Sequence, residues 1–360
     1  MLLARLTLLA LAVFASPVDD WKRISPELEL QFPADHGAHP DYRIEWWYIT
    51  GQLESEAGRR FGYQFTIFRR GMAMGEGTTA ESPLRARQVL AGHLAITDVE
   101  NGRTLFAERL RRAGSVLAEA SSTDLALVLD DWSLDRGADD RLELSAGDLA
   151  AEIGMELTLV PAKPLVFHGE DGYSQKGADP GNATAYFSWT RLATTGTLRI
   201  GGTELAVTGE SWFDHEYGSS VLEEGVVGWD WFGLQLDDGR DLMMFMLRTE
   251  DGGYSAASAG TLVDTDGSTR SLGSEDFKIE GRGEWTSPHS GARYPARWTL
   301  TVPSEDLRLE VTPLVADCEL GTAQTTGVAY WEGPVVLTGS RGGRGYAELT
   351  GYAGSMEGRL

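Results

Sequence analysis

The chain has 360 residues, of which 42% are hydrophobic, and a formal net charge of -23 with a pI of about 4.6. This length and composition suit one large or two ordinary domains with real cores, and disorder is not expected. The negative charge argues against nucleic acids and anionic membrane surfaces as partners, because both need basic patches. A neutral or hydrophobic small molecule is a better match.

The first fifteen residues have the pattern of a secretory signal peptide. Arg5 precedes an apolar run from Leu6 to Ala15, and Ser16 follows at a plausible cleavage point. The run is too short for a transmembrane helix, and no later stretch could span a membrane either. We therefore expect a secreted or periplasmic protein whose mature chain starts near Ser16. The alternative is a buried N-terminal strand or helix.

Cysteine usage limits how such an exported chain can be stabilised. Exported proteins often carry disulfides, but Cys318 is the single cysteine, so no intramolecular bridge can form. No base-rich motif accompanies it in DCEL. We predict a buried structural thiol rather than a nucleophile.

Short runs with alternating apolar and polar residues recur along the chain between Gly, Asp and Asn. The first half contains RIEWWYITGQL, FGYQFTIFR, GHLAITD, LALVLDDWSL, MELTLVP and YFSWTRL. The second half contains TELAVTG, WDWFGLQL, DLMMFMLR, RWTLTV, LRLEVTP and YWEGPVVLTG. A period of two with turn residues at such intervals is typical of antiparallel strands, and long helical patterns are absent. An all-β protein is predicted.

The two halves repeat each other in the same order. Residues 46–53 resemble 229–236, 91–105 resemble 259–272, 155–165 resemble 307–314, and 185–196 resemble 329–339. Four ordered matches indicate duplication of a β unit of roughly 150 residues. A unit with about eight strands suits a closed barrel that can enclose a ligand. We predict two tandem antiparallel barrels, over 16–198 and 199–360, with the boundary near 197–204.

Several motifs are similar to those of one known family. FPADHGAHPDYRIEWWYITG, AGHLAITD, HGEDGYSQKGADPGNATAYFSWTR, WFDHEYGSS, GWDWFGLQLDDGRDLM and YWEGPVVLTG resemble the AttH-like, carotenoid 1,2-hydratase family over nearly the whole mature chain. The resemblance implies a tandem lipocalin-like fold and a polyene, isoprenoid or lipid-like ligand. In the hydratase members, an Asp, a His and nearby aromatic residues are thought to protonate an alkene and steer water to the cation. Matched by motif, these are Asp230 and His215, with Trp229 and Tyr217 beside them.

Strand alternation sorts the charged groups of SWFDHEY onto two faces. One face carries Ser211, Phe213, His215 and Tyr217, and the other carries Glu210, Trp212, Asp214 and Glu216. We predict that the first set faces the ligand cavity. Asp214 and Glu216 should point away from it, toward solvent, the partner domain or arginines.

The same alternation places Asp230 on an apolar face with Phe232, Leu234 and Leu236. Burial there should raise its pKa, which a general acid working near neutral pH requires. We therefore predict that Asp230 and His215 share one cavity as catalytic residues. The alternative for Asp230 is a structural carboxylate bonded to a turn or an Arg. The alternative for His215 is a core histidine whose hydrogen bonds are satisfied within the protein.

Other residues are candidates for ligand contacts. Phe213 and Trp47 could line the cavity or simply fill the core, and Tyr173 could reach a ligand from the long polar segment 168–186. His93 lies between small residues that leave room for a ligand, although a histidine bonded to a strand carbonyl fits equally well.

A zinc site built from His36, His39, His93 and His215 is conceivable from the spacing of the first two. Gly37 and Pro40 instead make that pair look like a surface turn. We predict no metal and no cofactor.

The leading functional hypothesis is an exported protein that binds a hydrophobic molecule and acts on it by cofactor-free acid catalysis, as a hydro-lyase does. A non-catalytic carrier of lipocalin type is the alternative. A secreted hydrolase is less well supported, because the chain has no GxSxG nucleophile motif.

Overall fold

The computed structural model describes residues 21–72, 87–219 and 222–356. The predicted all-β fold is confirmed: the helices among these residues are the short 3₁₀ turns η1 (Ala34–His36) and η2 (Pro303–Glu305). No helix in the described ranges is long and apolar enough to cross a membrane. The signal peptide predicted over 1–15 lies outside the described residues.

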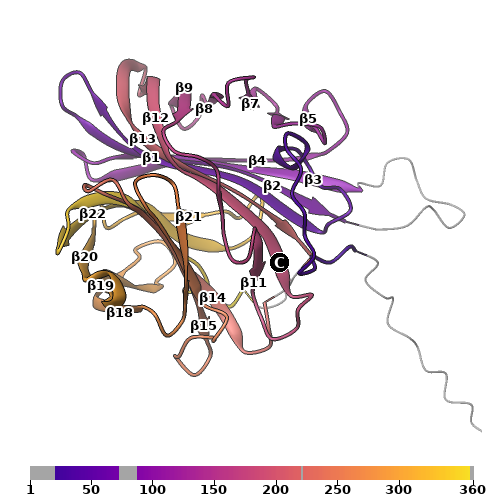
Figure 1. The fold of residues 1–360 in the computed structure, drawn as a ribbon. Helices are drawn as coiled ribbons and strands as arrows, with labels where there is room; N and C mark the ends of the chain where they lie inside the picture. Colours follow the sequence, from indigo (N-terminus) through magenta and orange to yellow (C-terminus); the bar gives the residue numbers. More distant parts are fainter. Residues whose placement is uncertain (1–20, 73–86, 220–221, 357–360) are drawn as a thin grey trace, which may run out of the picture.

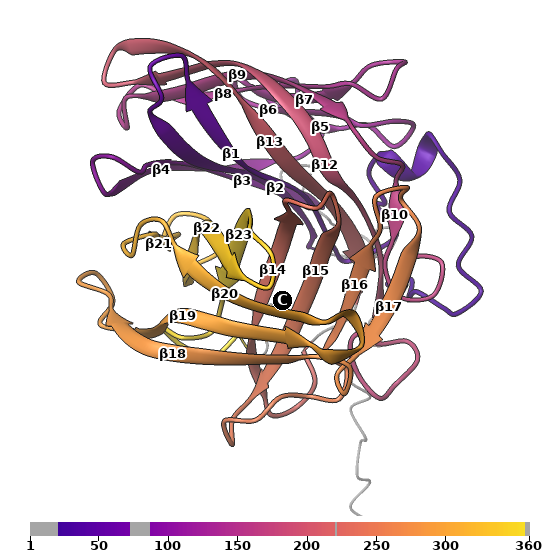
Figure 2. The same cartoon turned by 60° about the vertical axis from the view of Figure 1, so that its left-hand side comes forward.

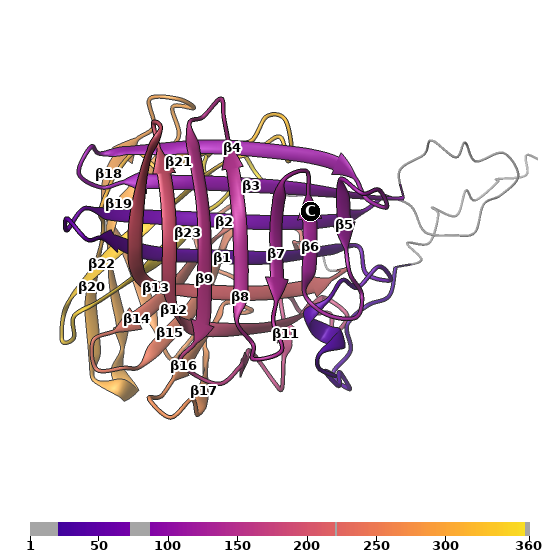
Figure 3. The same cartoon turned by 90° about the horizontal axis from the view of Figure 1, so that it is seen from above.

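The first barrel is a 13-stranded sheet that folds over on itself, so that β1–β4 cross β6–β9 (Figure 3). Its strands are β1 (Ile44–Ser55), β2 (Arg60–Gly71), β3 (Gln88–Asp98), β4 (Arg103–Arg112), β5 (Ala118–Ala120), β6 (Ala126–Leu129), β7 (Trp132–Arg136), β8 (Leu142–Asp148), β9 (Ile153–Pro161), β10 (Val166–Phe167), β11 (Tyr173–Gln175), β12 (Ala183–Ile200) and β13 (Thr203–Gly218). The hydrogen-bonded order is β4-β3-β2-β1-β13-β12-β9-β8-β7-β6-β5, with β10 and β11 beside β12.

The second barrel is a 10-stranded sheet. Its strands are β14 (Val226–Leu236), β15 (Asp241–Thr249), β16 (Ala259–Val263), β17 (Thr269–Gly273), β18 (Lys278–Thr286), β19 (Arg293–Val302), β20 (Leu307–Pro313), β21 (Glu319–Gly321), β22 (Ala329–Gly339) and β23 (Gly343–Leu349). The order is β17-β16-β15-β14-β23-β22-β20-β19-β18, with β21 beside β22. Within the described residues, neither path closes into a complete ring of hydrogen bonds.

The two barrels share one strand order, to which the first adds β5 and β6 at its far end and a second short strand beside β12. In each, four consecutive hairpin strands begin the sheet, and the last strand returns to pair with the first: β13 with β1, and β23 with β14. The sequence matches fall on equivalent strands, β1 with β14, β3 with β16, β9 with β20 and β12 with β22. The internal repeat that the sequence indicated is therefore also a repeat of strand order.

The boundary between the barrels lies later than predicted. The hairpin at Gly201 and Gly202 joins β12 to β13, and both strands belong to the first sheet. Residues 203–218 are thus part of the first barrel, and the chain passes to the second barrel between β13 and β14. A barrel of this topology needs its last strand to close against its first, and residue 198 precedes that strand.

The barrels stack face to face, with β1, β2 and β12–β13 against β14, β22 and β23 (Figures 1 and 2). Each has its own apolar core, and a third apolar cluster lies between them around Tyr48, Tyr186, Trp212 and Trp231. Both barrels therefore bury their outer as well as their inner face along these strands, so polar residues on the outer face are not automatically solvated.

Two equivalent glutamines bind the barrels together. Gln52 of β1 donates to the carbonyls of Val335 and Gly345, each at 2.8 Å. Gln235, at the matching position of β14, donates to the carbonyls of Thr190 at 2.8 Å and Ser211 at 3.0 Å. Each glutamine thus bonds the equivalent strands of the other barrel, and the interface has approximate twofold symmetry.

Candidate functional site

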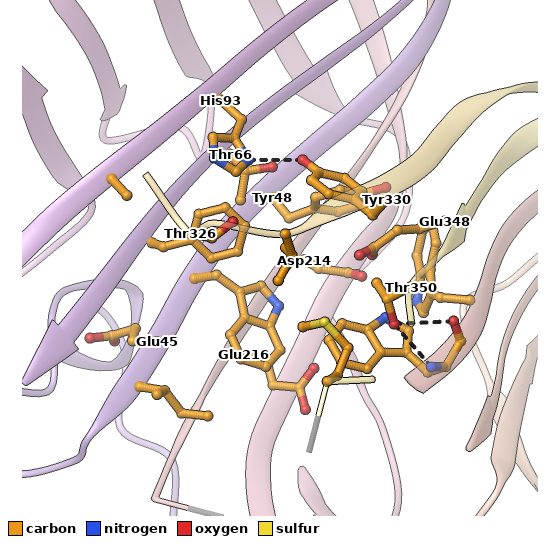
Figure 4. Close-up of a pocket in the computed structure, with 18 of the residues that line it drawn as sticks. Glu45, Tyr48, Thr66, His93, Asp214, Glu216, Thr326, Tyr330, Glu348 and Thr350 are labelled. Atoms are coloured by element: carbon orange, nitrogen blue, oxygen red, sulfur yellow. Dashed lines mark hydrogen bonds between the residues drawn. The ribbon is translucent and has the colours of Figure 1, made fainter. Parts of the chain in front are cut away.

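A cavity of about 310 Å³ lies between the barrels (Figure 4). Aromatic rings from both sheets form much of its wall: Trp46, Tyr48 and Tyr186 from the first barrel, and Trp229, Trp231 and Tyr330 from the second. These are outward-facing residues of their own barrels. The site exists because the two outer faces meet.

The repeat makes the walls of the cavity correspond in pairs. The alignment of residues 46–53 with 229–236 matches Trp46 with Trp229 and Tyr48 with Trp231. Asp214 lies opposite Tyr48 on the neighbouring strand, and Glu348 lies opposite Trp231. Asp214 and Glu348 are therefore equivalent carboxyl groups, one from the last strand of each barrel.

Asp214 is saturated with hydrogen-bond donors. The Tyr186 hydroxyl donates to Oδ2 at 2.7 Å, and the Ser188 hydroxyl and the Trp212 indole nitrogen donate to Oδ1. Burial raises the pKa of Asp214 to about 7, although these three donors oppose the rise. Asp214 thus holds together the strands around it as well as lining the cavity.

Glu348 has a second carboxyl group as its neighbour. Glu332 lies directly across from it on β22, at the position that Ser188 occupies in the first barrel. Directly opposed side chains have Cβ atoms roughly 5 Å apart, so two carboxylates there repel each other. The second barrel therefore has the carboxyl pair Glu332 and Glu348 where the first barrel has Ser188 and Asp214.

The pair is set up to retain protons near neutral pH. Burial and the charge of Glu348 raise the pKa of Glu332 well above its usual range. Burial raises the pKa of Glu348 to about 8, against hydrogen bonding from Trp229. Neither Glu332 oxygen has a hydrogen-bond partner of ordinary geometry, although Tyr48 and Tyr330 lie close enough to limit the rise. The result is a neutral acid facing aromatic rings.

His93 also faces this cavity, and it connects Tyr330 to the surface. Its Nδ1 is 2.8 Å from the Tyr330 hydroxyl, and its Nε2 is 2.8 Å from the Thr325 hydroxyl, which donates to Glu108. Burial lowers the pKa of His93 to about 3, so the ring is neutral. One ring nitrogen therefore donates and the other accepts. His93 therefore lies in the cavity wall, and its contact with a ligand stays a prediction.

His215 lies inside the first barrel, away from the cavity. Its Nε2 is 2.9 Å from Glu45, it stacks on Trp47 with ring centroids 4.8 Å apart, and its Nδ1 is buried without a partner. Burial lowers the pKa of His215, although the hydrogen bond to Glu45 opposes this. Tyr217 stacks on His39 at 3.5 Å in the same interior.

Asp230 lies inside the second barrel. Arg248 Nε donates to it at 3.0 Å, and the Tyr352 hydroxyl lies 3.1 Å from both of its oxygens. Burial raises the pKa of Asp230 to about 6, against the positive charge of Arg248. The pKa of Asp230 is therefore raised, as expected from its position on an apolar face. Asp230 also forms an ion pair with Arg248, which was one of the alternatives.

The prediction that His215 and Asp230 face one cavity, with Asp214 and Glu216 pointing away, is wrong. Alternation itself holds: His215, Phe213 and Tyr217 share the first interior, and Asp214 and Glu216 share the outer face. The cavity lies between the barrels, so it is lined by the outer face of β13 and not by its inner face. That outer face meets the partner barrel, which was one of the surroundings expected for Asp214 and Glu216.

The remaining predicted contacts divide in the same way. Trp229 lines the cavity, whereas Trp47 and Phe213 pack in the first core. The Tyr173 hydroxyl donates to the Pro180 carbonyl at 2.6 Å, and its ring joins that core. Trp229 and His93 are thus the two predicted site residues that reach the cavity, and the catalytic roles of His215 and Asp230 stay predictions.

The four histidines considered for zinc do not come together, because His93 faces the cavity between the barrels. His39, Glu45 and His215 do converge, with candidate ligand atoms within 4.8 Å of one another. Arg69 Nε already binds Glu45 at 2.6 Å, and hydrogen bonds to Asp35 and Glu45 raise the pKa of His39 despite its burial. The set could supply metal ligands, but here it forms a hydrogen-bonded ion-pair network.

Sequence reasoning missed the carboxyl pair. Glu332 interrupts the apolar strand YWEGPVV, and Glu348 interrupts YAEL. Strand alternation in these two runs, as in WFDHEYG, predicts that Glu332 and Glu348 lie on the face opposite the core residues Trp331 and Leu349. That two outward faces meet could not be read from alternation.

Comparisons with known proteins agree with this fold. A sequence profile described as AttH-like matches residues 23–352. A candidate AttH of Nitrosomonas europaea has a solved structure with a TM-score of 0.83 and 33% identity, covering 92% of this chain and 99% of that one. No curated protein matches significantly.

Two further solved structures share the fold at low identity. Kievitone hydratase of Nectria haematococca has a TM-score of 0.68 and 13% identity, covering 93% of this chain and 97% of its own. CghA, solved with Sch210972, has a TM-score of 0.52 and 13% identity, covering 88% and 90%. At this identity the likeness concerns the fold alone.

Proposed function

The chain belongs to the AttH-like family, and from that premise we propose that it binds an apolar small molecule between its barrels and protonates it from the Glu332–Glu348 pair. The observation that carries the proposal is a buried, unpartnered carboxyl group beside a second one in an aromatic cavity. The chemistry that suits it is addition of water to a carbon–carbon double bond, without a cofactor.

The steps balance within the cavity. A carboxyl of the pair gives its proton to one alkene carbon, which leaves a cation on the other carbon and a carboxylate on the protein. Aromatic ring faces stabilise that cation. Water adds to it and returns a proton to the carboxylate, so the pair ends as it began. A general acid of this kind contributes about 100-fold or more to the rate.

Support for the apolar ligand comes from the fold of hydratase and related neighbours and from the cavity wall. The known chemistry of kievitone hydratase is that of another protein at 13% identity. The proposal for this chain therefore rests on its own carboxyl pair.

The decisive experiment incubates the protein with an isoprenoid alkene in ¹⁸O-labelled water and detects addition of water by mass spectrometry. Glu332→Gln and Glu348→Gln keep the side-chain volume but remove a transferable proton, and each should slow turnover at least about 100-fold while ligand binding remains. Glu310→Gln, on β20 and outside the cavity, is the matched control.

Asp230→Asn provides the competing test. If it abolishes turnover while both cavity variants stay active, Asp230 is the acid, as the sequence predicted. Binding without turnover in the unmodified protein would support the carrier alternative.

We also propose that the protein is exported, on the strength of the signal-peptide pattern in residues 1–15. N-terminal sequencing of the protein recovered from its native cells should start near Ser16. A chain that retains Met1 inside the cells would contradict export.

A further inference from the structure

We propose that the cavity selects apolar ligands that carry a positive charge, because aromatic ring faces and carboxyl groups without a cationic partner surround the same space. The inference rests on the proposed function and names its ligand class. A permanent cation would be bound as a ligand, and the cation formed by protonating an alkene would be stabilised in the same surroundings.

Charge balance in the cavity wall is the first support. Among the charged groups in the wall, Glu45 pairs with Arg69 at 2.6 Å and Glu216 pairs with Lys176 at 3.1 Å. Arg70 is a third basic group of the wall, and in the part of the chain described Asp214, Glu332 and Glu348 make no salt bridge comparable to these two. The acidic excess is thus concentrated where the second barrel contributes its carboxyl pair.

Unpartnered buried atoms provide the second support. Within the described residues, neither the Glu332 oxygens nor the Tyr48 hydroxyl makes a hydrogen bond of ordinary geometry, although the two groups are neighbours; the residues are 2% and 6% exposed. A buried polar atom that makes no hydrogen bond destabilises the protein, and a neutral alkene could not supply the missing bond. A cationic ligand would give these oxygens an electrostatic partner.

The protein already binds one ammonium group in this manner. Lys176 Nζ lies 3.9 Å from the ring centroid of Phe245 and 5.1 Å from that of Tyr186, beside Glu216. A cation within about 6 Å of a ring face is attracted to it. Among the described residues, no lysine or arginine forms an ion pair with the carboxyl pair near Trp229 and Trp231, so a ligand cation can fill the corresponding role there.

Proton release follows from the carboxyl groups that such a cation would meet. The titratable and charged groups facing the space are Asp214 and Glu216 on β13, Glu332 and Tyr330 on β22, Glu348 on β23, Tyr48 and Glu45 on β1, Arg69 and Arg70 on β2, His93 on β3, Tyr186 on β12, and Lys176. A bound cation favours the ionised carboxyls, so protons should leave on binding and affinity should rise with pH between about 6 and 9.

The test compares two probes of the same shape, phenyltrimethylammonium and tert-butylbenzene, by calorimetry with the full mature protein. The charge of the first probe is permanent, so any proton released comes from the protein. It should bind at least about tenfold tighter than tert-butylbenzene and release close to one proton in paired buffers of different ionisation enthalpy. Affinity for tert-butylbenzene should not vary with pH.

Variants locate the effect. Glu332→Gln should reduce both the preference for the cation and the proton release, and Glu348→Gln serves as a second variant if the first does not fold. Glu310→Gln should leave both unchanged. Equal affinity for the two probes, or tight cation binding without proton release, would overturn the inference while leaving apolar binding intact. Binding of neither probe would overturn the inference and the proposed function together.

Discussion

The two barrels place equivalent carboxyl groups, Asp214 and Glu348, against one cavity but surround them differently. Asp214 receives hydrogen bonds from Ser188, Tyr186 and Trp212, so its charge has partners. Glu348 has Glu332 where the first barrel has Ser188, and the two carboxyls compete for protons. Duplication supplied two similar positions, of which one is suited to structure and the other to chemistry.

The difference teaches where to look for function in a duplicated fold. A position whose polar groups are fully satisfied stabilises the native state, whereas a position left unsatisfied costs stability and keeps a reactive group available. Substitutions of Asp214 and of Glu332 should therefore change stability in opposite directions.

The largest effect should come from Asp214→Ala. Removing this carboxylate leaves three buried donors without an acceptor, and we expect a loss of about 3 kcal/mol in the free energy of unfolding. Urea unfolding followed by tryptophan fluorescence measures it, with Glu119→Ala, at an exposed position of β5, as the surface control. A loss no larger than that of the control would show that the donors find other partners and that the comparison between the carboxyls is wrong.

The glutamine pair tests the symmetry of the interface. Gln52→Leu and Gln235→Leu each remove two hydrogen bonds to carbonyls of the other barrel, so each should lower the free energy of unfolding by about 2 kcal/mol. Cys318 reports the opening of the interface, because it is fully buried and lies 3.2 Å from Thr104 of the first barrel.

Thiol labelling of Cys318 under native conditions should therefore be faster in both glutamine variants than in the unmodified protein. Burial raises the pKa of this thiol to about 12, which keeps it unreactive while the barrels stay together. Faster labelling in one variant alone would indicate that the two bonds are not equivalent.

The smallest effect concerns pH. Because the pKa of Glu332 is raised in the folded state, the native protein holds a proton that the unfolded chain has released, and stability falls as pH rises from about 4 toward 8. Glu332→Gln removes this dependence. Between pH 5 and pH 8, the difference in stability should shift in favour of the variant by at least about 1 kcal/mol.

Urea unfolding at a series of pH values measures the difference in the free energy of unfolding between Glu332→Gln and the unmodified protein. The contributions of the other titrating groups cancel in this difference. Asp214→Asn should change the pH dependence in the same direction, because burial also raises the pKa of Asp214, to about 7. A constant difference between Glu332→Gln and the unmodified protein at all pH values would mean that Glu332 is already ionised.

Much of the fold was predictable from local patterns. Alternation in WWYITGQL and WDWFGLQL identified strands, the ordered matches between the halves identified the duplication, and the facing of Phe213 and His215 followed from parity alone. These properties depend on side chains a few residues apart along one strand, so the sequence carries them directly. The buried, unreactive Cys318 was likewise predicted.

The place of the cavity was decided by tertiary structure. Parity tells which residues of β13 share a face, but whether the outer face meets water or another barrel depends on how residues far apart in the chain pack. Glu332 and Glu348 become a pair through cross-strand register, and their raised pKa values need the first barrel to cover them. Long-range burial and register, which no short stretch of sequence contains, turned two unremarkable glutamates into the candidate acid.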